Sequence, residues 1–295
     1  MSITILEWFG RTVDDSSPGV SDLRFTNRCP FILDACAKQF PDGTRSGVCS
    51  IQTTEGALAI CPNRLYANDY RILIDAAEVV FGSGVEVVFA NNLRKTSGSN
   101  RVLAIGKRSG GEIRLPNRGK HGSYFVDWIL ARLTPANELA AFVALEVQTM
   151  DTTGTYKPEV LRLRKGATSV GPSVAGPNWE NVNKRILPQL IYKGHVLRRE
   201  AKCTHGLFFV CPEAVLNRIK TRLGDKLLNY PNLQPGSITF VGYDLRGTGS
   251  PRKLSKSSSF STTVDQVANA FVSPTNLPPV GSYEDAINDA LSRLC

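Results

Sequence analysis

The sequence predicts an α/β protein in which helices flank a mixed central sheet and a small four-cysteine, metal-binding segment precedes that sheet. Two apolar runs on either side of a turn indicate a β-hairpin over residues 124–154, and helical and strand patterns alternate around it. Four of the seven cysteines fall between positions 29 and 61. We expect an N-terminal region over 1–66, a core over 67–215 and a C-terminal region over 216–295 within the same domain.

The elements around the hairpin follow from periodicity and from helix-end residues. The pattern predicts a helix over 66–81 with Asn68 as its N-cap. After the hairpin, an amphipathic helix over 178–195 would be capped by Asn178 and disturbed by Pro188. The other expected elements are strands over 85–90, 207–211 and 237–243, a helix from Pro212, and helices over 263–272 and 282–294.

The composition indicates a soluble, basic protein. The chain has 295 residues, a hydrophobic content of 42%, a formal net charge of +9 at pH 7 and a pI of about 9.3. Its apolar runs are too short to span a bilayer, and the N-terminus does not have the pattern of a signal peptide, so we expect a cytoplasmic protein. The positive charge favours a polyanionic partner, nucleic acid before membrane.

Two acidic residues occupy corresponding positions in the predicted hairpin. Residues 134–138 read as its turn, and side chains alternate between the two faces of each strand. Asp127 lies in the first strand, and Glu146 lies in a second strand that is otherwise apolar on both faces up to Gln148. A carboxylate buried in a strand is costly unless a partner compensates it. A Mg²⁺ ion between Asp127 and Glu146 would compensate both charges.

An acid followed by an acid-x-polar triplet on the next strand is the arrangement of the restriction-endonuclease-like, PD-(D/E)xK nuclease core. It makes Asp127, Glu146 and Gln148 the candidate catalytic residues, and it makes Glu78, on the preceding helix, a possible further acid. That core usually has lysine at the third position, whereas glutamine carries no charge and can orient a water molecule through its amide. The alternative is structural: Asp127 would pair with an arginine such as Arg132, and Glu146 with a lysine elsewhere.

The cysteine-rich segment has the spacing C-x6-C-x12-C-x11-C and comprises Cys29, Cys36, Cys49 and Cys61. Four thiolates close in sequence can form a tetrahedral metal site that stabilises a small, turn-rich segment. All-thiolate ligation fits zinc or iron, and nothing in the segment supplies an open catalytic position, so the metal would be structural. The alternative is four separate buried thiols.

Two basic stretches suit contact with phosphate groups. The first spans residues 94–120, directly before the hairpin, and the second begins at Arg246 as a Ser/Gly loop that DNA would order. The alternative is that both are ordinary solvated loops. The candidate DNA-binding residues are Arg94, Lys95, Arg101, Lys107, Arg108, Arg114, Arg118, Lys120, Arg246, Arg252 and Lys253.

In combination, these segments resemble the NotI family of type II restriction endonucleases. The resemblance rests on CPF…C.K…G.CSI…ICPNR followed by VDWIL and FVALEVQTMDTTG, within residues 29–195. It implies a homodimeric, Mg²⁺-dependent bacterial enzyme that cuts GC-rich palindromes in double-stranded DNA, beside a cognate DNA methyltransferase. It also implies catalytic roles for Asp127, Glu146 and Gln148, and a metal site at the four cysteines that holds iron in the best-known member.

The implied reaction is phosphodiester hydrolysis that leaves 5′-phosphate and 3′-hydroxyl ends. Asp127 and Glu146 would hold Mg²⁺, and Gln148 would position the attacking water or a phosphate oxygen. Two subunits would cut a palindrome through matched two-fold symmetry, arginines would read guanine, and the C-terminal region would serve DNA contact or dimerisation. The competing hypotheses are a metal-containing DNA-binding regulator with an inactive nuclease fold, a redox metalloprotein, and a repair or mobile-element nuclease.

Overall fold

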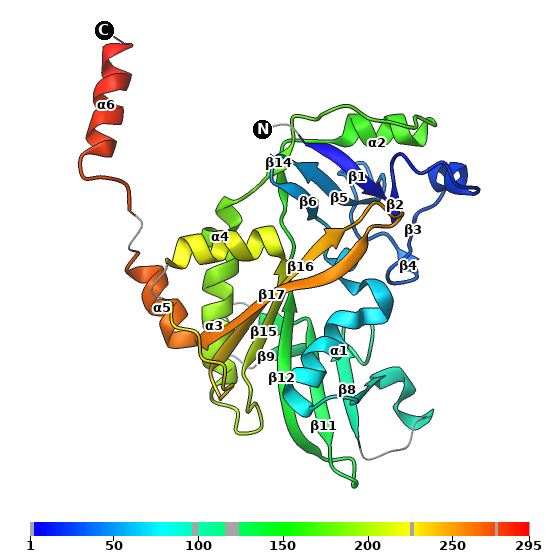
Figure 1. The fold of residues 1–295 in the computed structure, drawn as a ribbon, viewed down its shortest axis with the longest axis vertical. Coiled ribbons are helices and arrows are strands. Elements are labelled where there is room, and N and C mark those ends of the chain that lie inside the picture. The colour runs from blue at the N-terminus through cyan, green and yellow to red at the C-terminus, as the bar shows by residue number, and fades with distance from the viewer. Residues whose placement is uncertain (1–2, 96–99, 116–123, 225–226, 275–276, 295) are drawn as a thin grey trace.

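A seven-stranded mixed sheet forms the centre of the protein (Figure 1). The computed structural model describes residues 3–95, 100–115, 124–224, 227–274 and 277–294. In spatial order the strands are β17 (Lys253–Thr263), β16 (Ser237–Arg246), β15 (Leu207–Pro212), β12 (Leu139–Val147), β11 (Trp128–Leu133), β8 (Arg101–Gly106) and β7 (Glu86–Phe89). The pairs β12–β15, β15–β16 and β7–β8 are parallel, and the other neighbours are antiparallel.

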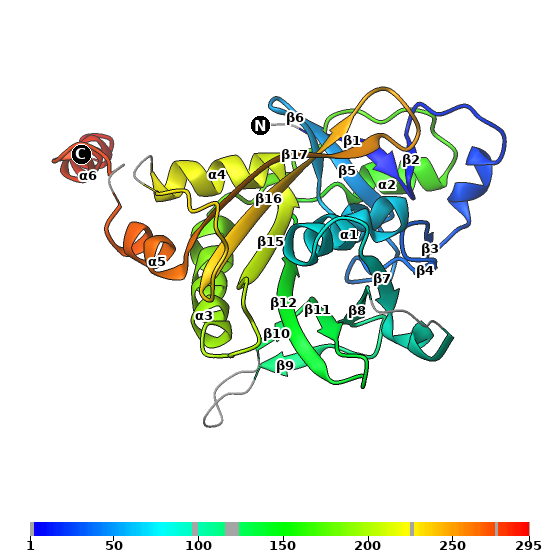
Figure 2. The same cartoon turned by 60° about the horizontal axis from the view of Figure 1, so that its bottom comes forward.

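Helices cover both faces of this sheet (Figures 1 and 2). On one face, α1 (Ala67–Phe81) buries Ile72 and Leu73 in a cluster with Leu130 and Phe208 of the strands. The helices of the opposite face are α3 (Leu187–Leu197), α4 (Glu213–Leu223) and α5 (Val264–Val272), which share a cluster with the alternate strand residues. The predicted α/β class, a mixed sheet flanked by helices, is confirmed.

A second, four-stranded sheet lies beside the first. Its order is β2 (Arg11–Thr12), β1 (Thr4–Trp8), β5 (Val48–Thr53) and β6 (Gly56–Ala59). Ile5 and Ile51 belong to the same hydrophobic cluster as the α3 face of the central sheet. The sequence analysis did not predict this sheet, in which β1 is an inner strand.

The remaining elements are short and lie around the two sheets. They are the 3-10 helices η1 (Val20–Arg24), η2 (Pro62–Tyr66) and η3 (Ala90–Lys95), the π-helical η4 (Val182–Ile186), and the helices α2 (Lys157–Arg164) and α6 (Ser282–Ser292). The short strand pairs are β3 (Arg28–Cys29) with β4 (Asp34–Ala35), β9 (Ile113–Leu115) with β10 (Tyr124–Val126), and β13 (Thr152–Thr153) with β14 (Gly176–Pro177). No helix within the described ranges is long and apolar enough to cross a membrane.

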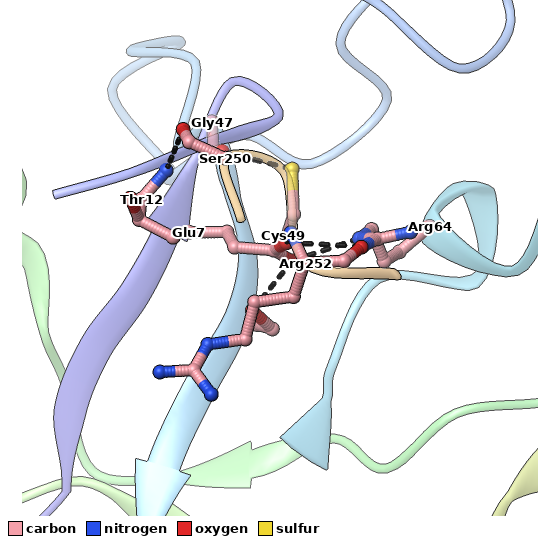
Figure 3. Close-up of polar contacts among 8 residues, drawn as sticks. Glu7, Thr12, Gly47, Cys49, Arg64, Ser250 and Arg252 are labelled. Carbon is pink, nitrogen blue, oxygen red and sulfur yellow. Dashed lines mark hydrogen bonds and ion pairs between the residues drawn. The ribbon is translucent and has the colours of Figure 1, made fainter. Parts of the chain in front are cut away.

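A buried ion pair joins the small sheet to the cysteine segment and to the loop between β16 and β17 (Figure 3). Glu7 and Arg64 are both 0% exposed, and the Arg64 Nε and Nη2 atoms lie 2.8 Å and 3.0 Å from the two oxygens of Glu7. The Ser50 hydroxyl also donates to Glu7, over 2.7 Å. From the loop, the backbone N–H of Arg252 donates to Glu7 Oε1 over 2.9 Å, and Ser250 Oγ accepts the backbone N–H of Thr12.

These contacts correct the prediction of a long mobile loop from Arg246. Strand β16 continues to Arg246, and β17 begins at Lys253 and pairs with it residue for residue at that end. Only residues 247–252 connect the strands, and the network around Glu7 fixes their backbone. The serines at 255 and 257–259 lie in an antiparallel edge strand, where alternating polar residues face solvent.

Three predicted helix ends are wrong. Asn68 is inside α1 rather than at its N-cap, which Tyr66 occupies, and its φ of 57° is left-handed. Pro188, by contrast, is the second residue of α3, and the predicted disturbance is present, because the turn before α3 is π-helical. Asn178 precedes that helix without capping it, since Asn181 holds the N-cap of η4. Pro212 is the N-cap of α4, one residue before the predicted position.

Candidate active-site cleft

The predicted hairpin places its two acids together. Strands β11 and β12 are antiparallel neighbours with Trp128 opposite Leu145, so that Asp127 and Glu146 come next in the same register. The predicted turn is present, because the backbone N–H of Thr134 donates to the carbonyl of Glu138 over 2.8 Å. Asp127 lies in the break between β10 and β11, and its Oδ2 accepts the backbone N–H of Val147 over 2.8 Å. The carboxylate is thereby tied to the strand that carries Glu146.

A lysine from α3 completes this arrangement. Lys193 is only 6% exposed, and its Nζ lies 2.6 Å from Glu146 Oε1. The structural alternative from the sequence is therefore half correct: Glu146 pairs with a lysine. Its other half is wrong, because Arg132 donates to the carbonyl of Phe81 and to Asn100 instead of to Asp127.

The site holds two acids and one ammonium group, so ionisation of both acids would leave it with an excess of negative charge. Burial and, to a lesser extent, the charge of Asp127 raise the pKa of Glu146 to about 8, against the opposing effect of Lys193. Burial also raises the pKa of Asp127, against the opposing effects of the Val147 N–H and of Lys193. A second cation close to both oxygen pairs would relieve the repulsion. The residues therefore fit a divalent cation.

The acids open onto a cleft of about 480 Å³. Gln148 lines it, with its Nε2 donating to the carbonyl of Thr149 over 3.2 Å, and so do Pro62 and Asn63 from the cysteine segment. The cationic side chains that line the cleft are Lys107, Arg108, Arg185 and Lys193. Glu112 and Asp151 line it as well, and Asp151 lies 3.4 Å from Arg185, so Asp127, Glu146 and Gln148 share one cavity with a rim of mixed charge.

Helix α3 and the π-helical η4 before it supply cleft residues that the sequence analysis missed. Arg185, Gln189 and Lys193 all line the cleft and follow each other at a spacing of four. Residues four apart lie on one face of a helix. Since a helix over 178–195 was predicted, this spacing was visible in the sequence. The sequence could not show that this face of the helix packs toward the hairpin.

The four cysteines are buried and lie near one another. Cys29 is in β3, Cys36 follows β4, Cys49 is in β5 and Cys61 precedes η2. Burial raises the pKa of the Cys49 thiol well above its ordinary range and that of Cys61 to about 11, with neighbouring cysteines contributing to both. The backbone N–H of Asn63 bonds to the sulfur of Cys61 and has the opposite effect. Bringing four sulfurs together makes a thiolate site possible.

Metal ligation by these cysteines nevertheless stays a prediction. In the part of the chain that the structure describes, no group of three or more His, Cys, Asp or Glu side chains is arranged to hold a metal ion. The side chains of the segment are instead held by hydrogen bonds: the Cys49 thiol donates to the carbonyl of Gly47 over 3.4 Å, and the Cys36 thiol to that of Lys38 over 3.6 Å.

The predicted DNA-binding residues separate into several groups. Lys107 and Arg108 line the cleft, and Arg108 forms an ion pair of 2.6 Å with Asp34 of β4. Arg101 and Arg114 lie in β8 and β9, while Arg246, Arg252 and Lys253 lie at the far end of the β16–β17 hairpin. Arg94 and Lys95 end η3, but their side chains, like residues Arg118 and Lys120, lie outside the described part. Glu78 pairs with Arg71 on α1 and does not line the cleft.

Comparison with known proteins adds no relative. No protein-family model matches the chain, and no curated protein matches it significantly. The fold, the paired acids of the hairpin and the cleft that they line are therefore the basis for assigning a function.

Ionisation of Glu146 predicts how the stability of the metal-free protein depends on pH. Because its pKa is raised when the protein is folded, the native state binds more protons than the unfolded state between about pH 4.5 and 8. Stability in the presence of a chelator is expected to fall as pH rises through that window. The variant Glu146→Gln should lack this contribution, so its stability relative to the natural protein should increase with pH. Urea denaturation at several pH values measures both; a relative stability independent of pH would contradict the prediction.

Proposed function

We propose that the protein is a type II restriction endonuclease, which hydrolyses phosphodiester bonds in double-stranded DNA at a specific sequence in a Mg²⁺-dependent reaction. The observation that carries the proposal is the pair of partly buried carboxylates, Asp127 and Glu146, at an open cleft that Lys107, Arg108 and Arg185 also line. The resemblance of the cysteine segment and the hairpin to the NotI family supports the same function. From that resemblance we also propose a GC-rich, palindromic site, 5′-phosphate products, a homodimer and a cognate methyltransferase.

Asp127 and Glu146 would hold the catalytic Mg²⁺, because hard carboxylate oxygens are the ligands this ion prefers. Bound there, the ion would lower the pKa of a water molecule and stabilise the charge that develops on the phosphate. A structural zinc or iron ion at Cys29, Cys36, Cys49 and Cys61 would stabilise the cleft wall that contains Pro62 and Asn63.

The chain's own groups would orient the substrate and the water. Gln148 lines the cleft next to the acids, and its amide can accept one hydrogen bond from a water molecule while donating another. Lys107, Arg108 and Arg185 offer charge-assisted contacts to the phosphates on either side of the scissile bond. Glu146 lies in β12 and Gln148 directly follows that strand, and both line the same cleft.

A plasmid nicking assay tests the proposal. Supercoiled DNA that contains the recognition sequence is incubated with the protein and Mg²⁺, Ca²⁺ or a chelator, beside the variant Asp127→Asn. We expect cleavage with Mg²⁺ alone and none by the variant. Equal cutting by Asp127→Asn, or cutting in the chelator, would contradict the proposed roles.

A second candidate function is a DNA-binding regulator with an inactive nuclease fold. The ion pair between Glu146 and Lys193 favours it, because a satisfied pair needs no metal, and so does the uncharged Gln148 in place of lysine. A specific complex with DNA, without Mg²⁺-dependent nicking under any tested condition, would select this function over the nuclease.

The contribution of Lys193 distinguishes the two functions. In the nuclease, replacement by methionine should lower cleavage by about 10²- to 10³-fold, since the group supplies a preorganised positive charge beside the reacting phosphate. In the regulator, the same variant should change stability alone. Single-turnover cleavage and urea denaturation of Lys193→Met and Lys193→Arg separate these outcomes; undiminished cleavage by the methionine variant would exclude the catalytic contribution.

A further inference from the structure

Helix α6 stands apart from the rest of the protein (Figures 1 and 2). None of the residues Ser282–Ser292 is buried. Tyr283 is 81% exposed, and Ile287 and Leu291 are exposed as well. These three residues are four apart and therefore form one apolar stripe along the helix. An amphipathic helix whose apolar face meets only solvent needs a covering surface.

The short length of α6 supports the need for a covering surface. An isolated helix of fewer than about 12–15 residues is marginal in water, and most helices in proteins are stabilised by packing of their apolar face. Helix α6 has 11 residues. The segment before it adds further exposed apolar side chains, Leu277 and Val280, and Leu294 follows it. Contiguous apolar surface of this kind marks a site of association.

The charge of α6 restricts what can cover it. Glu284, Asp285 and Asp289 make the helix acidic, although the whole chain carries a formal charge of +9. An acidic helix is repelled by nucleic acid and by anionic membrane surfaces. It is attracted by a basic protein surface, and a second copy of this chain presents one.

The end of α5 provides a matching surface on that second copy. Val272, its last residue, is 72% exposed. Beside it, the guanidinium of Arg222 lies 5.1 Å from the ring centre of Phe271 and donates to the Phe271 carbonyl over 3.3 Å. Among the described residues, no carboxylate pairs with Arg222. An apolar side chain next to an uncompensated positive charge complements the stripe and acids of α6.

We propose that α6 of each copy docks on the α5 end of a second copy, so that two chains form a dimer by reciprocal exchange of their C-terminal helices. Such an interface is isologous, since the same two surfaces meet twice about a two-fold axis. Tyr283, Ile287 and Leu291 would cover Val272, and Glu284 would approach Arg222. The inference deepens the homodimer of the proposed function, because it names the surface that joins the subunits.

The oligomeric state of matched variants tests this proposal. Sedimentation velocity of the full chain should give a dimer. Ile287→Asp with Leu291→Asp adds two carboxylates to the apolar stripe. This variant should be a monomer with an unchanged circular dichroism spectrum. Ser282→Asp with Ser292→Asp adds the same charge away from the stripe and should leave the dimer intact. A monomeric natural chain, or a dimer that persists in the stripe variant, would overturn the proposal.

A cross-linking experiment tests where the helix docks. One preparation carries Val272→Cys and the other Ile287→Cys, both with Cys295→Ser. After mixing and mild oxidation, a covalent dimer that contains both variants is expected. A dimer that never forms this cross-link would place α6 elsewhere and overturn the docking site. Neither measurement depends on DNA cleavage, so the dimer can be refuted while the nuclease stands, or the reverse.

Discussion

Replacing Glu146 by alanine is expected to lower the rate of DNA cleavage by about a thousandfold, equivalent to about 4 kcal/mol of transition-state stabilisation. The side chain lies opposite Asp127 across two paired strands and shares its cleft. Removing it leaves Asp127 as the only acid of the hairpin pair, and one carboxylate is too few protein ligands to fix a divalent cation beside the phosphate. The rate should be measured under single-turnover conditions, on a duplex that contains the recognition sequence.

A DNA-binding measurement and a control variant make the predicted effect of Glu146→Ala specific. Binding of the duplex without metal should be retained or strengthened, because the variant removes an acidic group from the cleft that anionic DNA would enter. The control Glu78→Ala removes a carboxylate that pairs with Arg71 on α1, away from the cleft, and should cut normally. A Glu146→Ala enzyme that retains cleavage within about tenfold would contradict the assigned role.

Replacing Glu7 by alanine is expected to destabilise the fold by about 3–5 kcal/mol, the range for breaking a buried ion pair. The variant would leave the Arg64 guanidinium without a counter-ion where both side chains are 0% exposed. It would also remove the acceptor of the Ser50 hydroxyl and of the Arg252 backbone N–H, and so release the loop between β16 and β17. Urea denaturation measures the loss directly.

A surface ion pair provides the matched control. Glu55 lies 2.7 Å from Arg218, with both side chains well exposed, so Glu55→Ala should change stability by about 0–1 kcal/mol. If Glu7→Ala cost no more than Glu55→Ala, the network around Glu7 could not be what joins the small sheet to the cysteine segment.

The sequence predicted the long elements because their patterns are strong. Strands β12, β15 and β16 are apolar on both faces, and such runs are typical of inner strands flanked by helices. The small sheet was missed because β2 and β6 are short, and their pairing joins segments far apart in the chain. The same limit applies to Glu7 and Arg64, which are 57 positions apart and become partners only through tertiary packing.

In the candidate site too, the local pairing could be predicted from the sequence, whereas the tertiary contacts could not. Period-two alternation and a recognisable turn were sufficient to bring Asp127 and Glu146 together, because a hairpin is local. Lys193 could not be assigned, since its contact with Glu146 depends on how α3 packs across the sheet. The four cysteines were predicted to lie together and are close enough to influence each other's pKa, while the metal that they would bind awaits measurement.

The central claim is site-specific, metal-dependent DNA cleavage at the cleft of Asp127 and Glu146. Purified protein should be incubated with a large DNA of known sequence, with Mg²⁺ or with EDTA, beside the Glu146→Ala variant. We predict discrete fragments with Mg²⁺ alone, absent from the variant, whose sequenced ends share one palindromic site. Unmethylated DNA that stays intact in every reaction, although the protein binds it specifically, would contradict the claim and leave a DNA-binding protein with a nuclease-like cleft.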